Sequence, residues 1–326
     1  MKKLTFLLLT VFTLGANAQS FYFPPNTGPW DTLSPVSLGW CQPQIDSLYN
    51  YLETRNTNGF IILKDGKIVL EKYFGTFTQD SVNMWASAGK CLTSMLTGIA
   101  QEEGLFTIDD TVSNIIGPWT SCTAPQEQQI TVRHLLTMTS GLNDYPSGGC
   151  DNLDSNTPCL QYLAAPETRW AYHTGPYRKL EDIISAASGV TYNNYTQTRI
   201  GNTIGMSGLW VNSVFYSRVR DAARFGLLAL NKGIWASDTL LHDTAYFNDM
   251  INTSQNYNLS YGYLWWLNGK ASYMAPGLQT VYTTPFFSNA PADLIAALGK
   301  NDQKIYVVPS QNMVVVRLGN SAYGVA

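Results

Sequence analysis

Apolar residues follow helical spacing in two segments of the first third of the chain, with a strand-like segment between them. Residues 42–54 predict an amphipathic helix, because apolar side chains recur three or four positions apart at Ile45, Leu48, Tyr49 and Leu52. The apolar runs 60–63 and 68–70 flank Asp65-Gly66, which predicts a β-hairpin. A second helix is predicted over 91–103 and ends at Gly104.

The last third of the chain returns to strand-like patterns. Apolar runs at 261–267, 304–309 and 313–318 predict antiparallel strands, and the segments 132–139, 177–187 and 219–231 between the two ends are helical or loop-rich. We therefore expect an α+β fold in which one antiparallel sheet, built from both chain ends and flanked by helices, carries a mostly helical insert. Residues 19–326 are expected to form a single domain, with an α/β lobe at about 40–110 and 215–320 and a helical lobe at about 110–215.

The first 18 residues have the pattern of a secretory signal. Lys2 and Lys3 precede an apolar run over 4–14, and Ala16-Asn17-Ala18 provides a cleavage site. We expect a periplasmic or secreted protein without a membrane span, since no later run reaches the roughly 20 apolar residues that a membrane helix needs. Removing the two lysines changes the net charge from -3 to about -5, that is -3 minus 2. An acidic chain of this kind argues against nucleic acid as a partner.

Five cysteines remain after the signal, and an oxidising compartment permits disulfides. Cys150 and Cys159 enclose a polar loop, so we expect these two to pair. Cys91 lies inside the second predicted helix and is expected to be a small buried apolar residue. A pair between Cys41 and Cys122 stays open. The cysteines are too widely spaced for a closed zinc site, and no His-Glu-x-x-His motif is present, so no metal or cofactor is expected.

The stretch Ser87-Ala-Gly-Lys90 carries the main chemical signal. It lies at the start of the second predicted helix, where residues three apart share a face and backbone N–H groups favour negative charge. A lysine held among apolar neighbours and other cations loses its proton more easily, so Lys90 could accept the Ser87 hydroxyl proton. The alternative is a helix cap followed by a solvated lysine. No other serine in the chain has a lysine three residues later.

A second candidate segment follows in the helical insert. Tyr172 could pass protons between Lys90, the nucleophile and a leaving group, provided nearby cations lower its pKa. His173 adjoins it and could line the cleft, and Thr174 could hydrogen-bond a substrate carbonyl. Each could equally be a packing or turn residue when considered alone.

Together these motifs resemble the serine β-lactamase and penicillin-binding-protein superfamily, in particular its class C branch with esterases and D-amino-acid peptidases. The resemblance rests on Ser87-Ala-Gly-Lys90 and the residues after it, on 130–142, 169–172, 220–228 and 261–266, and covers about residues 40–319. It implies a β-lactamase/transpeptidase-like fold and an acyl-enzyme on Ser87. Lys90 would be the base and Tyr172 the proton relay, and two backbone N–H groups would hold the oxyanion, one from Ser87 and one near residues 300–303.

The sequence departs from that family pattern in three places. Thr174 stands where asparagine is usual. The usual Lys-Thr-Gly or His-x-Gly is absent, and Gly299-Lys300-Asn301-Asp302-Gln303 precedes the predicted strand at Ile305 instead. We expect Lys300 and Asn301 to contact the substrate there, with Lys300 supplying positive charge. Family members commonly continue past the last strand into a helix, so whether the chain is complete at Ala326 stays open.

Other chemistries fit less well. Trp85-Ala-Ser87-Ala-Gly89 lacks the first glycine of the α/β-hydrolase motif Gly-x-Ser-x-Gly, and the histidine base that such an enzyme needs is not evident: His134 is expected to be structural. Glu167 lies in a turn and receives no catalytic role. The same scaffold could also serve as an acylated sensor that does not turn over.

The sequence as a whole predicts an exported serine hydrolase for small molecules, acting on carboxylic esters, small amides or D-amino-acid peptides. A non-turnover penicillin-binding protein or sensor is the first alternative and a β-lactamase the second. The loop over 145–159 is expected to distinguish among the substrates, and the oligomeric state stays open.

Overall fold

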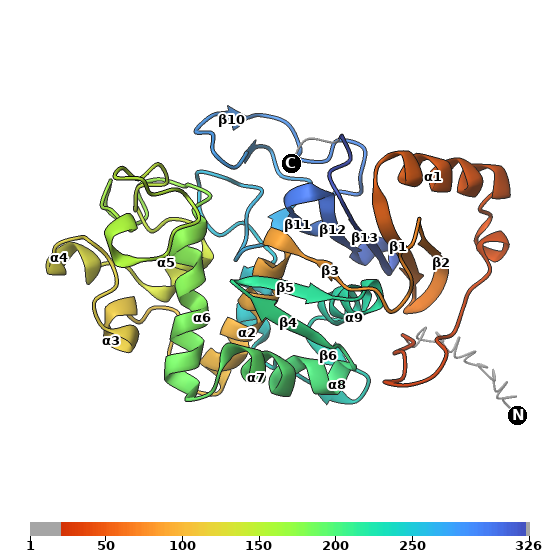
Figure 1. Ribbon diagram of the computed structural model, residues 1–326, viewed down its shortest axis with the longest axis horizontal. Coiled ribbons are helices and arrows are strands. Elements are labelled where there is room, and N and C mark those ends of the chain that lie inside the picture. The colour runs from red at the N-terminus through yellow and green to blue at the C-terminus, as the bar shows by residue number, and fades with distance from the viewer. Residues whose placement is uncertain (1–20, 324–326) are drawn as a thin grey trace, which may run out of the picture.

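The computed structural model describes residues 21–323. Its centre is a six-stranded sheet in the order β2-β1-β13-β12-β11-β8, in which all neighbouring strands are antiparallel. The strands are β1 (Thr57–Lys64), β2 (Lys67–Tyr73), β8 (Trp266–Leu267), β11 (Ile295–Gly299), β12 (Gln303–Val308) and β13 (Met313–Gly319). Because β1 pairs with β13, the two ends of the chain meet in one sheet, as predicted (Figure 1).

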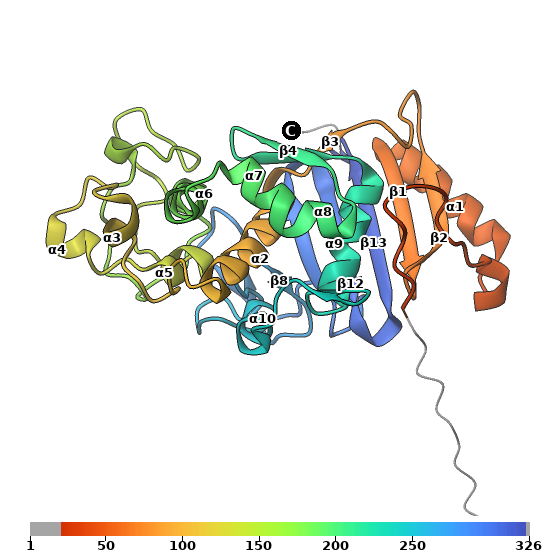
Figure 2. The same ribbon diagram turned by 90° about the horizontal axis from the view of Figure 1, so that it is seen from below.

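Helices cover both faces of this sheet. The helix α1 (Gln42–Thr54) packs on one face, where Ile45 and Leu52 meet Phe60 and Ile62 in a small core. On the other face lie α9 (Val219–Leu230) and α2 (Gly89–Glu102), as Figure 2 shows. The alternation of buried side chains along β1 places Ile61 and Leu63 in this second, larger core.

Residues 112–188 of the helical insert lie at the end of the molecule away from α1, and residues 192–204 return toward its middle (Figure 1). The helices of the insert are α3 (Val112–Ile116), α4 (Ala124–Glu127), α5 (Val132–Leu136), α6 (Thr174–Ser188), α7 (Tyr192–Thr196) and α8 (Asn202–Ile204), and α10 (Thr244–Met250) follows α9. Short strands complete the fold: β3 (Asn83–Met84), β4 (Gly208–Val211), β5 (Val214–Ser217), β6 (Ile234–Trp235), β7 (Asp238–Thr239), β9 (Tyr273–Met274) and β10 (Val281–Tyr282). Single 3-10 turns include η2 (Ala86–Ala88) and η5 (Lys300–Asp302).

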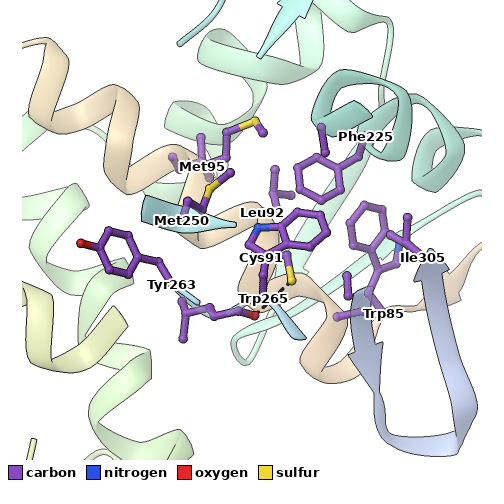
Figure 3. Close-up of a cluster of buried hydrophobic side chains, with 14 of the residues drawn as sticks. Trp85, Cys91, Leu92, Met95, Phe225, Met250, Tyr263, Trp265 and Ile305 are labelled. Atoms are coloured by element: carbon purple, nitrogen blue, oxygen red, sulfur yellow. Dashed lines mark hydrogen bonds between the residues drawn. The ribbon is translucent and has the colours of Figure 1, made fainter. Parts of the chain in front are cut away.

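The helix α2 is almost entirely buried. Every residue from Gly89 to Ala100 is buried, so apolar contacts surround the helix on all sides. Figure 3 shows Leu92 in one cluster with Trp85, Trp265 and Phe225. The Cys91 thiol donates to the Leu264 carbonyl at 3.2 Å, in agreement with its expected buried role. This packing fixes the position of the helix start, where Ser87 lies.

One part of the prediction was wrong, and one hairpin was missed. The run 261–267 forms a strand only at Trp266–Leu267, because the backbone turns at Leu264, which has φ 65°. The Leu264 amide donates to the Leu136 carbonyl instead of to a strand, and the aromatic side chains around it fill the core. The hairpin of β4 and β5 inside the helical insert was not predicted.

The expected signal, residues 1–18, lies outside the described residues. Within residues 21–323, no helix is both long and apolar enough to cross a membrane.

Candidate active site

Ser87 lies in the 3-10 turn η2 that leads directly into α2. The residue before it, Ala86, has φ 47°, a left-handed conformation that is unusual for a residue with a Cβ atom. The turn is held in place because the Trp85 amide donates to the Phe215 carbonyl at 2.8 Å and the Trp85 indole N–H donates to the Ser217 hydroxyl at 2.8 Å. A strained backbone fixed by its surroundings is a frequent feature of functional sites.

Lys90 follows one turn later and is only 3% exposed. Its Nζ donates to the Ser87 hydroxyl at 3.1 Å. The same amine lies 4.3 Å from the centre of the Tyr177 ring and 5.2 Å from that of Tyr172. Burial, followed by the positive charge of Arg178, lowers the pKa of Lys90 to about 7. A substantial fraction of this lysine is therefore neutral near pH 7 and able to accept a proton.

Tyr172 is held among aromatic rings beside Ser87. Its ring stacks on Trp266 at 6.0 Å and meets the edge of Tyr261 at 6.2 Å. The expectation that cations lower its pKa was wrong: burial raises the pKa of Tyr172, and a hydrogen bond with Ser87 only partly opposes that effect. The phenol therefore stays protonated at neutral pH, so it can donate a hydrogen bond but is not present as a phenolate base.

A cavity of about 580 Å³ opens at Ser87. Tyr172 and Thr174 line it, together with the loop over 144–153 and with Pro276 and Gly277. His173 does not line the cavity. Its side chain is 2% exposed and is turned into the protein near Asp144 and Arg169. This corrects the expectation that His173 contacts the substrate. Burial lowers the pKa of His173 to about 4, so it is neutral at physiological pH.

Asn152 is a site residue that the sequence analysis missed. Its side-chain amide donates to the Tyr172 carbonyl at 3.0 Å, and its Oδ1 accepts from the Thr174 amide at 3.1 Å. These bonds fix the segment of Tyr172 and Thr174 against the loop. Asn152 itself lines the cavity. No motif marks it in the sequence, because its role depends on a fold that brings two loops together.

The segment proposed for the missing third motif lies beside the turn η2 that carries Ser87. Lys300 and Asn301 belong to the turn η5 between β11 and β12, and this turn contacts η2. Neither residue is among those that line the cavity, and Lys300 is exposed to solvent. The residue of this segment that approaches the nucleophile turn is Gly299, since a Cβ atom there would lie 2.1 Å from the Trp85 carbonyl oxygen.

The predicted disulfide between Cys150 and Cys159 is present, with a Cα–Cα distance of 5.5 Å, and clasps one wall of the cavity. Cys41 and Cys122 are free thiols, so they do not pair. Asp154 lies close to the two bridged sulfur atoms. Cys150, Asp154 and Cys159 form the only group of three His, Cys, Asp or Glu side chains with metal-ligand spacing among residues 21–323. Because the sulfur atoms are bonded to each other, they are not available as thiolate ligands.

The family model described as Beta-lactamase matches residues 51–326. The chain belongs to the beta-lactamase family. The match covers most of the chain and includes both Ser87 with Lys90 and the sheet behind them. The antiparallel sheet flanked by helices is the fold of this family's solved structures, to which the chain is similar throughout.

The individual proteins to which the chain is similar share less than a third of its residues over the matched regions. The chain is 29% identical over 171 residues to the candidate penicillin-binding protein PbpX of Bacillus subtilis, which is 48% of this chain and 42% of that protein. It thus spans less than half the length of this relative. Among solved structures, a candidate 6-aminohexanoate-dimer hydrolase from Bacillus anthracis superposes with a TM-score of 0.70 at 19% identity, over 93% of this chain and 84% of that one. A penicillin-binding protein from Bacillus halodurans gives 0.63 at 15% identity, over 85% and 97%.

Proposed function

We propose that this beta-lactamase family member is an exported serine hydrolase that forms an acyl-enzyme on Ser87. The observation that carries the proposal is the 3.1 Å hydrogen bond between the Ser87 hydroxyl and a buried Lys90 whose pKa is lowered to about 7. A hydroxyl next to a neutral amine, at the mouth of a cavity, is the arrangement that nucleophilic catalysis needs.

In the acylation step, Ser87 Oγ attacks the carbonyl carbon of the substrate while its proton passes to Lys90 Nζ. The negative charge on the carbonyl oxygen is stabilised by the backbone N–H of Ser87 and by a second N–H from the segment around residues 299–303 that lies against η2. As the tetrahedral intermediate collapses, the bond to the leaving group breaks. Lys90 returns the proton, and the protonated Tyr172 relays it to the leaving group.

Deacylation reverses these roles with water as the nucleophile. Water attacks the acyl carbon, its proton passes to Lys90, and Ser87 leaves with a proton as the free acid is released. Thr174 lies in the cavity wall, and its hydroxyl supplies one hydrogen bond to the carbonyl side of the substrate.

Within the family we place the protein in the class C-like branch and assign it carboxylic esters, small amides or D-amino-acid peptides, acting from residues 19–326 as one catalytic domain. Thr174 and the absence of Lys-Thr-Gly support an esterase or amidase over a β-lactamase. The structural relative named for a 6-aminohexanoate dimer is an amide hydrolase by name, which agrees with this substrate range. A penicillin-binding or sensor role is the second candidate, supported by the relative PbpX.

The test is hydrolysis of 4-nitrophenyl acetate by the purified protein and by Ser87→Ala. The matched control is Ser94→Ala, because Ser94 lies on α2, the helix that directly follows the turn carrying Ser87, but is fully buried. We expect turnover in the parent and in Ser94→Ala and its loss in Ser87→Ala. A single burst of product without turnover would indicate the sensor, and turnover that survives Ser87→Ala would refute the proposal.

A further inference from the structure

The cavity at Ser87 is walled mainly by apolar side chains. Tyr145, Pro146, Leu153 and Pro276 line it from two loops that lie far apart in the sequence. The Tyr145 hydroxyl donates to the Gly277 carbonyl, so the two loops are joined at the rim of the cavity. Tyr145 is 67% exposed and Leu153 is 50% exposed, so both present apolar surface at the rim of the cavity.

The apolar surface continues outward along the second loop. Leu278 comes directly after Gly277 and is 44% exposed, and Val281 and Tyr282 of β10 are exposed as well. These exposed apolar residues follow in the sequence the loop that carries Pro276 and Gly277 of the cavity wall. An extended apolar or aromatic chain attached to the scissile group would bury this surface.

The charges in the cavity wall are negative. Two carboxylates line it, and no lysine or arginine does. Asp144 is buried and paired with Arg169 at 2.6 Å, so its charge is compensated. Asp151 is exposed, accepts the Leu153 amide at 2.7 Å, and forms no ion pair with any residue in the described range 21–323. A second carboxylate brought in by a ligand would be repelled by Asp151.

We infer that the cavity selects substrates with an uncharged, apolar chain and rejects those whose chain carries a carboxylate. This inference rests on the proposed function and names the substrate class of the same site. It narrows the proposed substrates to carboxylic esters and uncharged small amides, and it separates the protein from enzymes whose substrates carry a carboxylate, such as β-lactam antibiotics and D-amino-acid peptides with a free carboxyl terminus. Asp151 and Leu153 are the residues that determine this specificity.

The experiment measures binding in Ser87→Ala by isothermal titration calorimetry, so that no hydrolysis is required. The two ligands are hexananilide, which is neutral, and adipic acid monoanilide, which has the same chain length and ends in a carboxylate. We expect hexananilide to bind more tightly by roughly threefold to tenfold, the scale of one charge repulsion at a solvated site.

Added substitutions assign the effect. Asp151→Asn keeps the oxygen that accepts the Leu153 amide and should bring the two affinities together, whereas Asp46→Asn, which removes an exposed carboxylate on α1, should leave their ratio unchanged. Leu153→Ser should weaken hexananilide about fivefold, through loss of apolar contact. Equal affinity of Ser87→Ala for both ligands, binding of neither, or a ratio that Asp151→Asn does not change would overturn the inference. The proposed function fails separately, if ester turnover survives the loss of Ser87.

Discussion

Two segments meet beside Ser87, the buried helix α2 and the exposed turn η5, and they are held in different ways. The side chains of α2 are enclosed by the core, and Lys90 is placed against Ser87 by that packing. The turn η5 is held by polar contacts, since Arg317 donates to the carbonyls of Asn301 and Asp302 at 2.9 Å and 3.0 Å. A segment built on a core helix retains a recognisable motif, whereas a segment built on a turn can keep its backbone position while its side chains change.

This contrast predicts that activity depends most on α2, which carries Lys90. We expect Lys90→Ala and Lys90→Met each to lower the acylation rate by about a hundredfold or more, the scale of general base assistance. Lys90→Met retains most of the buried apolar volume, so its loss of activity would not arise from a cavity in the core. Stopped-flow measurement of the first turnover with 4-nitrophenyl acetate checks this, and a near-normal rate in Lys90→Met would remove Lys90 from the mechanism.

The proton relay is expected to matter nearly as much. Tyr172→Phe keeps the ring that stacks on Trp266 and removes only the hydroxyl, so the fold should remain and acylation should fall by about a hundredfold. The effect should be larger for anilides than for nitrophenyl esters, because aniline needs a proton as it leaves. Equal rates in Tyr172→Phe and the parent on an anilide would exclude the relay.

In the segment at Gly299 and η5, the backbone is expected to matter more than the side chains. Gly299→Ala places a Cβ atom 2.1 Å from the Trp85 carbonyl, which forces β11 away from η2 and should lower kcat/KM by about tenfold to a hundredfold. Gly226→Ala is the control, because it introduces a 2.5 Å contact with the Val314 side chain on the sheet, remote from the cavity. Thermal melts should show both variants destabilised, with activity per folded molecule reduced only in Gly299→Ala.

The pH profile tests the protonation state of the base. Lys90 must be neutral to accept the Ser87 proton, and its pKa is about 7, so acylation should rise by about tenfold per pH unit below pH 6 and level off above pH 8. Pre-steady-state rates between pH 5 and pH 9 check this. A flat profile over that range, or a limb that rises only near the ordinary lysine pKa, would contradict the assigned role.

The smallest effect is expected at Lys300. Its side chain is exposed and outside the cavity wall, so Lys300→Ala should change KM by at most about threefold, as for other solvated charges. Lys232→Ala, another exposed lysine, is the matched control. A loss of more than tenfold in Lys300→Ala alone would show that this turn supplies a substrate contact after all.

The sequence predicted most of what hydrophobic spacing controls. The helix at 42–54, the Asp65-Gly66 hairpin and the strands of both chain ends agree with α1, β1, β2, β12 and β13, because the helix buries one regular face and the strands are short apolar runs bounded by turns. The prediction of a strand over the whole run 261–267 was wrong, because an apolar run has the same sequence pattern whether its backbone is extended or turns. Its turn depends on Leu264 meeting Leu136 from another element.

The site was predictable where short motifs carry it, at Ser87 with Lys90 and at Tyr172 with Thr174. Ser87 and Lys90 are one turn apart in the sequence, and the structure joins them by a hydrogen bond. Asn152 and Asp151 reach the cavity through a loop whose path no local pattern specifies. His173 was wrongly directed toward the substrate because adjacent residues in extended backbone face opposite sides, and Tyr172 takes the side that faces Ser87.

The central claim is that Ser87 carries the acyl group, and intact-protein mass spectrometry with peptide mapping tests it most directly. The protein is incubated with 4-nitrophenyl acetate and quenched in acid within the first turnover. We predict one added acetyl group, mapped to the peptide that contains Ser87 and absent in Ser87→Ala. An adduct on another residue, or turnover without any adduct under conditions where deacylation is slow, would contradict the account.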